Sequence, residues 1–290
     1  MDLLTWEHRP KLRRPVLVIA FEGWNDAGDG ASAAAAYLAR RFNAVRFATI
    51  DPEEFYDFTS TRPEVRLEDG VTRTIEWPEN VFSASPLGST GRDVVFLRGT
   101  EPQLRWRTFA GLVVEVAHAM EVELVVGLGA LLAEVAHTRP VRVTGTAADR
   151  ALVDRLGLRP SRYEGPTGIL GVLGDAFHHA GIPSASLWAS VPAYVGQTPS
   201  PKAALALVSR LTDLLDFTVP TVDLDVAAAA YERQVNEVVA GDEDAIAYVQ
   251  SLEEVDDAED EDDDEGGSDE LELPGGDALA AEVERYLREQ

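Results

Sequence analysis

Short apolar runs alternate with segments of helical spacing along most of the chain. The first run, Val16–Phe21, contains no polar position, as expected of a strand buried on both faces of a sheet. The glycine-bearing loop 22–30 and an alanine-rich helical segment follow it. This order is typical of the start of an open α/β sheet, in which ligands bind outside the carboxyl ends of the strands. We therefore expect functional residues in this loop.

The same alternation continues to residue 215. Strands are predicted at 44–50, 93–97, 123–128, 141–146 and 184–191, and helices at 104–120, 169–180 and 201–215. Thr100 and Gln103 form a capping signature before the first of these helices, and Ser200 with Pro201 forms another before the last. Residues 62–77 have the alternation and the Asp-Gly turn of an inserted hairpin. The order predicts an α/β fold with a mostly parallel sheet covered by helices.

The last third of the sequence changes character. Residues 222–252 predict two further helices, the second of which restarts at Asp242 after Gly241, so that residues 1–254 form one domain with a C-terminal helical extension. Residues 255–276 are rich in acid and glycine and predict a disordered linker. Residues 277–290 regain the spacing of an amphipathic helix, which is either a docking motif or a helix that folds back onto its own domain. Its apolar stripe consists of Leu279, Val283, Tyr286 and Leu287.

Composition narrows the class of protein. With 290 residues, 45% of them hydrophobic, the chain is long enough for a full core, and it has no cysteine for disulfides or thiolate chemistry. The first residues are polar and mixed in charge, unlike a signal peptide, and no apolar run approaches the roughly 18 residues of a membrane span. We expect a soluble, cytoplasmic protein with no membrane contact. Because the net charge is −26, nucleic acid is a poor partner.

The loop after the first strand carries three polar candidates, Glu22, Asn25 and Asp26. Its glycine spacing matches neither a dinucleotide-binding fingerprint nor a Walker loop, and its carboxylates would repel a polyphosphate. One interpretation is a tight turn in which Asp29 caps the following helix. The other is a polar pocket that binds a cationic or hydroxyl-rich group.

Two more polar clusters are candidates for the same pocket. His137 and Arg139 lie just before a predicted strand, so we expect them at the sheet edge opposite the first loop. His137 is the best acid/base candidate because the pKa of a histidine lies near neutrality, although a structural role is the simpler interpretation. Arg162 and Glu164 precede the helix at 169–180, where they form either a pocket wall or a turn.

Established catalytic signatures are missing from the sequence. The five histidines form no His-x-x-x-His pair, and no Gly-x-Ser-x-Gly elbow occurs. We therefore expect no metal and no cofactor, and we assign no catalytic residue.

Several long motifs, taken in order, resemble one known family. They are FEGWNDAGDGAS, TRPEVR, GTEPQLRWRTF, LGALLAEVAHTRPVRVTGTA, SRYEGPTGILGVL and SLWASVPAYV. Over about Leu12 to Leu252 the chain is similar to the actinobacterial branch of the PAC2 family, the proteasome assembly chaperone family.

This resemblance implies a phosphorylase/hydrolase-like α/β fold, a homo-oligomer such as a trimer or another small ring, and a chaperone that binds proteasome subunits. It brings no catalytic residues that can be placed here. Proteasome activators often end in a hydrophobic-Tyr-X motif, whereas Tyr286 is followed by four residues. Two alternatives stay open: an enzyme of this fold acting on a small polar substrate, and an oligomeric scaffold whose acidic tail serves solubility.

Overall fold

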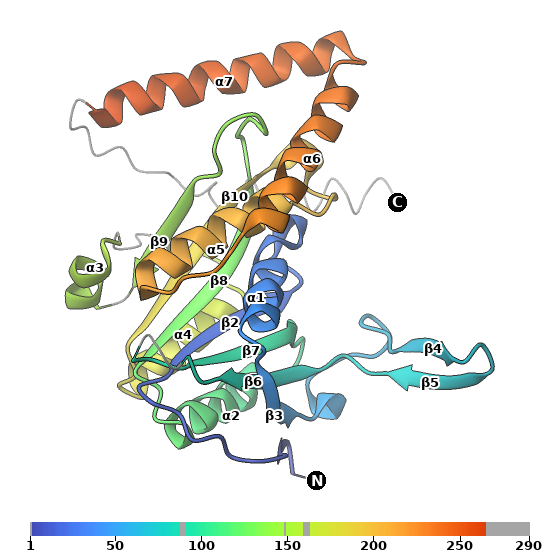
Figure 1. The fold of residues 1–290 in the computed structure, drawn as a ribbon, viewed down its shortest axis with the longest axis vertical. Coiled ribbons are helices and arrows are strands. Elements are labelled where there is room, and N and C mark those ends of the chain that lie inside the picture. Colours follow the sequence, from blue (N-terminus) through green and yellow to red (C-terminus); the bar gives the residue numbers. More distant parts are fainter. Residues whose placement is uncertain (1, 88–90, 148, 159–162, 265–290) are drawn as a thin grey trace.

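A computed structural model describes residues 2–87, 91–147, 149–158 and 163–264. Its centre is an eight-stranded mixed sheet (Figure 1). In spatial order the strands are β1 (Leu4–Trp6), β3 (Val45–Ile50), β6 (Asn80–Ser85), β7 (Val94–Thr100), β2 (Val16–Glu22), β8 (Leu124–Ala133), β10 (Ser184–Pro192) and β9 (Val143–Ala147). The predicted α/β class is confirmed.

The middle of the sheet is parallel and both flanks are antiparallel. β7, β2, β8 and β10 are parallel neighbours, whereas β1, β3 and β6 on one side and β9 on the other add in antiparallel fashion. The long apolar runs that led to the parallel prediction belong to this middle. The flanking strands have more exposed positions, as antiparallel edges tolerate.

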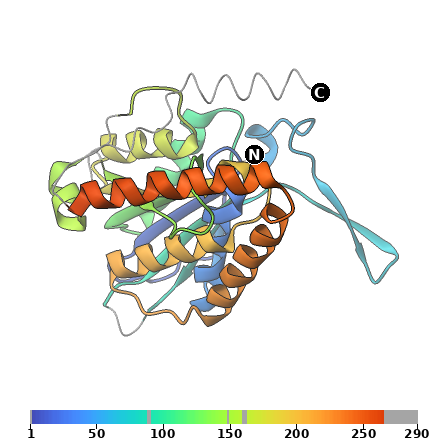
Figure 2. The same cartoon turned by 90° about the horizontal axis from the view of Figure 1, so that it is seen from above.

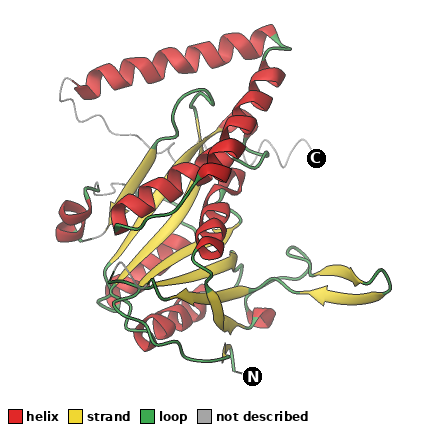
Figure 3. Cartoon of the chain, in the orientation of Figure 1, coloured by secondary structure: helices red, strands yellow, loops and turns green. Residues whose placement is uncertain are grey.

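Helices cover both faces of the parallel middle (Figure 3). α1 (Gly30–Arg41) and α5 (Pro201–Leu215) pack on one face, against Val16 and Val18 of β2. α2 (Trp106–Ala119) and α4 (Ile169–His179) pack on the other, against Leu17 and Ile19. Successive side chains of a strand point to opposite faces, so both of these sets must be apolar. This explains the unbroken run Val16–Phe21.

The two predicted helix caps have different outcomes. Ser200 is the N-cap of α5, and its hydroxyl accepts a hydrogen bond from the Ala203 amide, as predicted. The cap assigned to Thr100 is wrong, because Thr100 is the last residue of β7. α2 begins only at Trp106, after Arg105 in the left-handed region.

A two-stranded arm interrupts the order of the sheet. β4 (Glu64–Glu68) and β5 (Thr72–Glu76) form the predicted antiparallel hairpin, which extends away from the sheet in Figures 1 and 2. Val65, Leu67 and Ile75 are exposed on it. The remaining short helix, α3 (Arg150–Leu156), lies beside β9 (Figure 1).

Two helices follow the sheet. α6 (Val222–Val239) and α7 (Glu243–Asp264) are separated at Gly241, as predicted, and Asp242 accepts hydrogen bonds from the first amides of α7. α7 continues to Asp264, into the stretch expected to be a disordered linker, so the predicted helix end near Leu252 is wrong. The rest of that linker and the amphipathic segment 277–290 lie outside the described residues. Within the described part of the chain, no helix is both long and apolar enough to span a membrane.

Candidate functional site

The loop after β2 is held in place by buried polar side chains. Asp26 Oδ1 accepts hydrogen bonds from the amides of Ala31 (2.7 Å) and Ser32 (3.1 Å), and so satisfies the first turn of α1. The predicted cap, Asp29, has φ 53° and makes no side-chain cap, so that assignment is wrong. Gly28 also has positive φ, and a Cβ there would lie 3.0 Å from the Cβ of Ser200.

Burial raises the pKa of Asp26 to about 6, although its hydrogen bonds with Ser32 and Ala31 favour the charged form. Asp26 and Asn25 are only 5% and 3% exposed. These two side chains therefore stabilise the conformation of the loop and are not exposed on its surface.

Glu101, immediately after β7, joins three segments. Its carboxylate accepts hydrogen bonds from the Trp24 amide (3.2 Å), the Asn25 side-chain amide (3.0 Å) and the Ile169 amide at the start of α4 (2.9 Å). Gly168 allows this close approach, since a Cβ there would lie 2.3 Å from Asn25 Nδ2. Glu101 is not among the candidate residues predicted from the sequence. The available signal was an acid directly after a buried strand.

A cleft of about 420 Å³ opens beside Glu101, and we call it the tryptophan cleft. It is lined by Glu22, Gly23, Trp24, Thr61, Thr100, Glu101, Pro102, Gln103 and Trp106. It lies at the carboxyl ends of β2 and β7, whose connections leave through α1 on one face of the sheet and α2 on the other. This is the switch point at which open α/β sheets bind ligands. Burial, and next the charge of Asp29, raise the pKa of Glu22.

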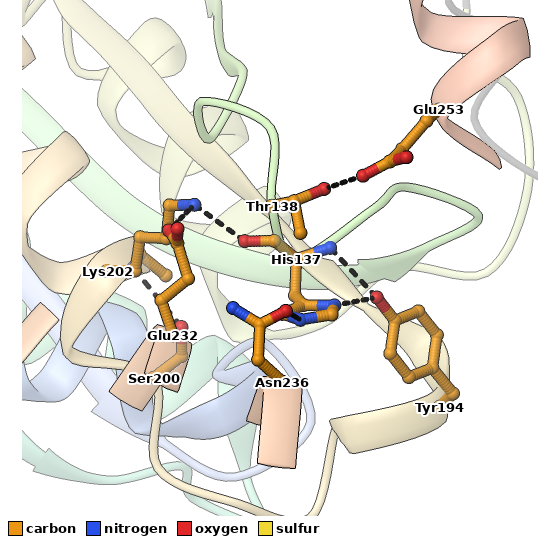
Figure 4. A network of polar contacts seen from close by, with 9 residues as sticks. His137, Thr138, Tyr194, Ser200, Lys202, Glu232, Asn236 and Glu253 are labelled. Carbon is orange, nitrogen blue, oxygen red and sulfur yellow. Dashed lines mark hydrogen bonds and ion pairs between the residues drawn. The ribbon is translucent and has the colours of Figure 1, made fainter. Parts of the chain in front are cut away.

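A second cavity, of about 110 Å³, lies beside His137, and we call it the histidine cavity. Figure 4 shows the polar network around it, contributed by the segment after β8 and by α5, α6 and α7. The ring nitrogens of His137 contact the Tyr194 hydroxyl (Nδ1, 2.7 Å) and Asn236 Oδ1 (Nε2, 3.1 Å). This pairing assigns the Nε2–H tautomer, which donates to Asn236 and accepts from Tyr194.

His137 has the environment of a structural histidine. It is only 2% exposed, and burial, with the nearby Lys202, lowers its pKa, so the ring is neutral near pH 7. The Lys202 ammonium donates to the His137 carbonyl and to Glu232, at 2.6 Å each. Burial raises the pKa of Tyr194 to about 12. The network therefore holds the segment after β8 against α5 and α6.

The predicted pocket residues are distributed over two places. Glu22 lines the tryptophan cleft, whereas His137 and Arg139 line the histidine cavity. Neither His137 nor Arg139 lines the tryptophan cleft, and Glu22 does not line the histidine cavity. Glu164 is exposed and lines neither cavity, and Arg162 lies outside the described residues.

The expectation that His137 lies at the opposite sheet edge from the first loop is wrong. β8 continues to Ala133, beyond the predicted end at Leu128, and the Ala130 amide donates to the Asn25 carbonyl. Both cavities therefore lie along the carboxyl edge of the parallel strands. Among the described residues, no group of three or more His, Asp or Glu side chains is arranged to hold a metal ion.

Comparisons with known proteins agree with this fold. The sequence model of the PAC2 family matches residues 20–239. A PAC2 family protein from Streptomyces avermitilis is 47% identical, with a TM-score of 0.76 over 81% of this chain and 99% of its own. A proteasome-assembly chaperone homologue from Mycobacterium tuberculosis is also 47% identical, with a TM-score of 0.74 and the same coverage.

An archaeal proteasome activator from Pyrococcus furiosus shares the fold at 19% identity, with a TM-score of 0.68 over 81% of this chain and 97% of its own. Among curated protein sequences there is no significant match.

Proposed function

This chain belongs to the PAC2 family, and from that premise we propose that it is a non-enzymatic protein-binding member that associates with proteasome subunits during their assembly. The observation that carries the proposal is the 47% identity to the Mycobacterium tuberculosis proteasome-assembly chaperone homologue, over 99% of that chain. We also propose that the protein acts in the cytoplasm, a location that fits this role.

The polar side chains at the carboxyl edge support a binding function over an enzymatic one. An enzyme acting on a small polar substrate needs the three candidate loops in one cleft, yet Glu22 and His137 line separate cavities. Asp26 Oδ1, the Glu101 carboxylate and the His137 ring also form hydrogen bonds with groups of the protein itself. Glu22 and His137 therefore do not share the single cleft on which the enzymatic alternative rests.

We further propose that the protein works as a homo-oligomer, such as a trimer or another small ring. The resemblance to the family suggests this, and the hairpin of β4 and β5 supports it. Val65, Leu67 and Ile75 alternate with polar residues on the two strands, so they share one face that the chain itself leaves exposed. A two-stranded hairpin is marginal without such cover. Native mass spectrometry of the full chain measures the number of copies.

The proposed function is tested by binding to α-type proteasome subunits encoded by the same organism. The tagged full chain is mixed with these subunits, and complexes are separated by size-exclusion chromatography and identified by mass spectrometry. We expect the chain to co-elute with free subunits or half-assembled precursors and to speed their assembly. A chain ending at Gly276 tests whether residues 277–290, with the predicted docking stripe, contribute.

An unrelated acidic α/β protein serves as the control for non-specific association. If neither the full chain nor the shortened chain retains any subunit or precursor above this control, the proposed function is wrong.

A further inference from the structure

α7 contacts the rest of the molecule along one narrow stripe. Among its side chains up to Asp257, Val249, Leu252 and Asp256 are buried, and the others are exposed or half-buried. These three positions are spaced three and four residues apart and so lie on one helical face. Val249 and Leu252 pack with Ala136 and Tyr194, at the rim of the histidine cavity.

Three contacts of α7 pair acids on the helix with donors on the segment after β8, whereas the Tyr248 hydroxyl of α7 donates to Glu134 of that segment. Arg139 forms an ion pair with Asp257 (2.6 Å), and Arg142 forms one with Asp256 (3.3 Å). The Thr138 hydroxyl donates to Glu253, as Figure 4 shows. We call the surface formed by Ala136, Thr138, Arg139, Arg142 and Tyr194 the α7 receptor surface. Its charge is complementary to that of the helix seated on it.

The covalent attachment of α7 allows it to leave this surface without disturbing the sheet. α7 follows α6 through the short turn at Gly241 and lies outside the two helical layers of the sheet, as Figures 1 and 2 show. Among the described residues, its buried apolar side chains pack against Ala136 and Tyr194 of the α7 receptor surface and against Val239 of α6. An element with so few buried contacts opens at lower free energy than the core.

We propose that the α7 receptor surface is a binding site for an acidic amphipathic helix of another protein, and that α7 occupies it as an intramolecular competitor. The ligand needs two apolar side chains three residues apart, followed by acids one, four and five residues after the second, because Val249, Leu252, Glu253, Asp256 and Asp257 have this spacing. The two arginines then select acidic helices over basic ones. The identity of the proteasome-related partner does not enter this inference, so each can fail without the other.

The test uses the full chain and a fluorescent peptide that spans Glu243–Asp264. In the wild-type chain the tethered α7 competes at high effective concentration. Leu252→Asp in the chain weakens the seating of its own α7 and leaves the receptor surface intact. We expect the wild-type peptide to bind this variant at least about tenfold more tightly than it binds the wild-type chain, by fluorescence anisotropy.

Val255→Asp is the matched control, because Val255 lies on the same helix but is 54% exposed. It introduces the same charge and should leave peptide binding at the wild-type level. Adding Arg142→Glu to the Leu252→Asp variant should abolish the gain. If the peptide binds the Leu252→Asp and Val255→Asp variants equally well, or if Arg142→Glu has no effect, the proposal is wrong.

A second measurement does not depend on any variant folding. Hydrogen–deuterium exchange of the wild-type chain should show the amides of 243–257 exchanging at least about tenfold faster than those of α5, which is buried along the sheet. Equal protection of the two helices would mean that α7 does not leave its surface, and the proposal would fail.

Discussion

Single polar side chains at the carboxyl edge determine how the loops are held. Glu101 links the loop after β2 to the start of α4, Asp26 satisfies the first turn of α1, and His137 ties the end of β8 to α6. Each serves backbone or side-chain groups that would otherwise be buried without a partner, and such groups are costly to leave unpaired. Substituting these side chains should therefore change the free energy of unfolding, whether or not it changes the binding of a partner.

Glu101→Ala should lower the free energy of unfolding by about 2–4 kcal/mol, because three donors lose a charged acceptor together. Urea unfolding followed by circular dichroism measures the change. Glu115→Ala, at an exposed position of α2, is the control and should stay within about 0.5 kcal/mol of wild type. Equal effects of the two substitutions would contradict the role given to Glu101.

Asp26 makes stability depend on pH in a definite direction. Its folded pKa of about 6 lies above the ordinary aspartate value of 3.8, so its contribution to stability is most favourable at low pH and is lost as the pH rises through about 6. The Asp26→Asn variant carries no such charge. Relative to wild type, it should gain up to about 3 kcal/mol in unfolding free energy between pH 4 and pH 7. Parallel pH profiles of the two proteins would refute this.

The sequence predicts which loops carry polar residues but not where their side chains point. A pocket was one of two interpretations for Asn25 and Asp26. Asp26 turns inward because the amides of Ala31 and Ser32 need an acceptor there, and the Asn25 side chain turns inward to donate to Glu101. Glu101 was missed because its three donors come from segments far apart in the chain. Such convergence becomes visible only when the strands have their spatial order.

At the scale of elements, exposure separates the parallel middle of the sheet from the arm of β4 and β5. Both contain β-branched and aliphatic residues, yet the strands in the middle are covered by helices on both faces, whereas no described helix covers the arm. Truncating the same type of residue should therefore change the free energy of unfolding by different amounts in the two places.

The isoleucines at 19 and 75 are a matched pair for this comparison, since Ile19 in β2 is 1% exposed and Ile75 in β5 is 56% exposed. Ile19→Ala should lower the free energy of unfolding by about 2–5 kcal/mol, because it leaves a cavity in the core. At a dilution at which native mass spectrometry detects single copies, Ile75→Ala should change it by less than about 0.5 kcal/mol, because the single chain leaves this side chain exposed. Denaturant unfolding of the protein without any partner measures both changes. A loss above about 2 kcal/mol for Ile75→Ala would show that the arm is covered.

Most elements are predictable from the pattern of apolar positions, because buried strands and amphipathic helices differ in period. The direction in which neighbouring strands pair is harder to predict from the sequence. β3 and β6 mix polar with apolar positions, and they pair in antiparallel fashion, in a register that sets Val45 opposite Ala84 and that no local pattern specifies. The end of α7 was misplaced because acidic composition favours disorder, whereas the helix continues through Asp256, which pairs with Arg142.

The whole molecule carries a formal net charge of −26, and fourteen of its acids lie between Glu253 and Glu272. Self-repulsion on this scale disfavours the compact state. Salt screens it, because the Debye length falls from about 30 Å at 0.01 M to about 8 Å at 0.15 M.

The melting temperature of the full chain should therefore rise when sodium chloride increases from about 10 mM to about 150 mM. Differential scanning calorimetry measures the change, with a sucrose series of matched osmolality as the control for general solvent effects. A melting temperature that falls with salt would mean that the surface ion pairs, such as that of Arg46 with Glu7, outweigh the repulsion.

The position of β2 in the sheet also affects how the protein is made. Val16 pairs with Val94 on one side and with Leu124 on the other, so the first apolar strand to leave the ribosome waits for both of its neighbours. At about 5–20 residues per second, translation delivers them several seconds later. During that interval the apolar segment Val16–Phe21 has neither of its neighbouring strands, so its hydrogen-bonding edges and both of its faces stay open to water.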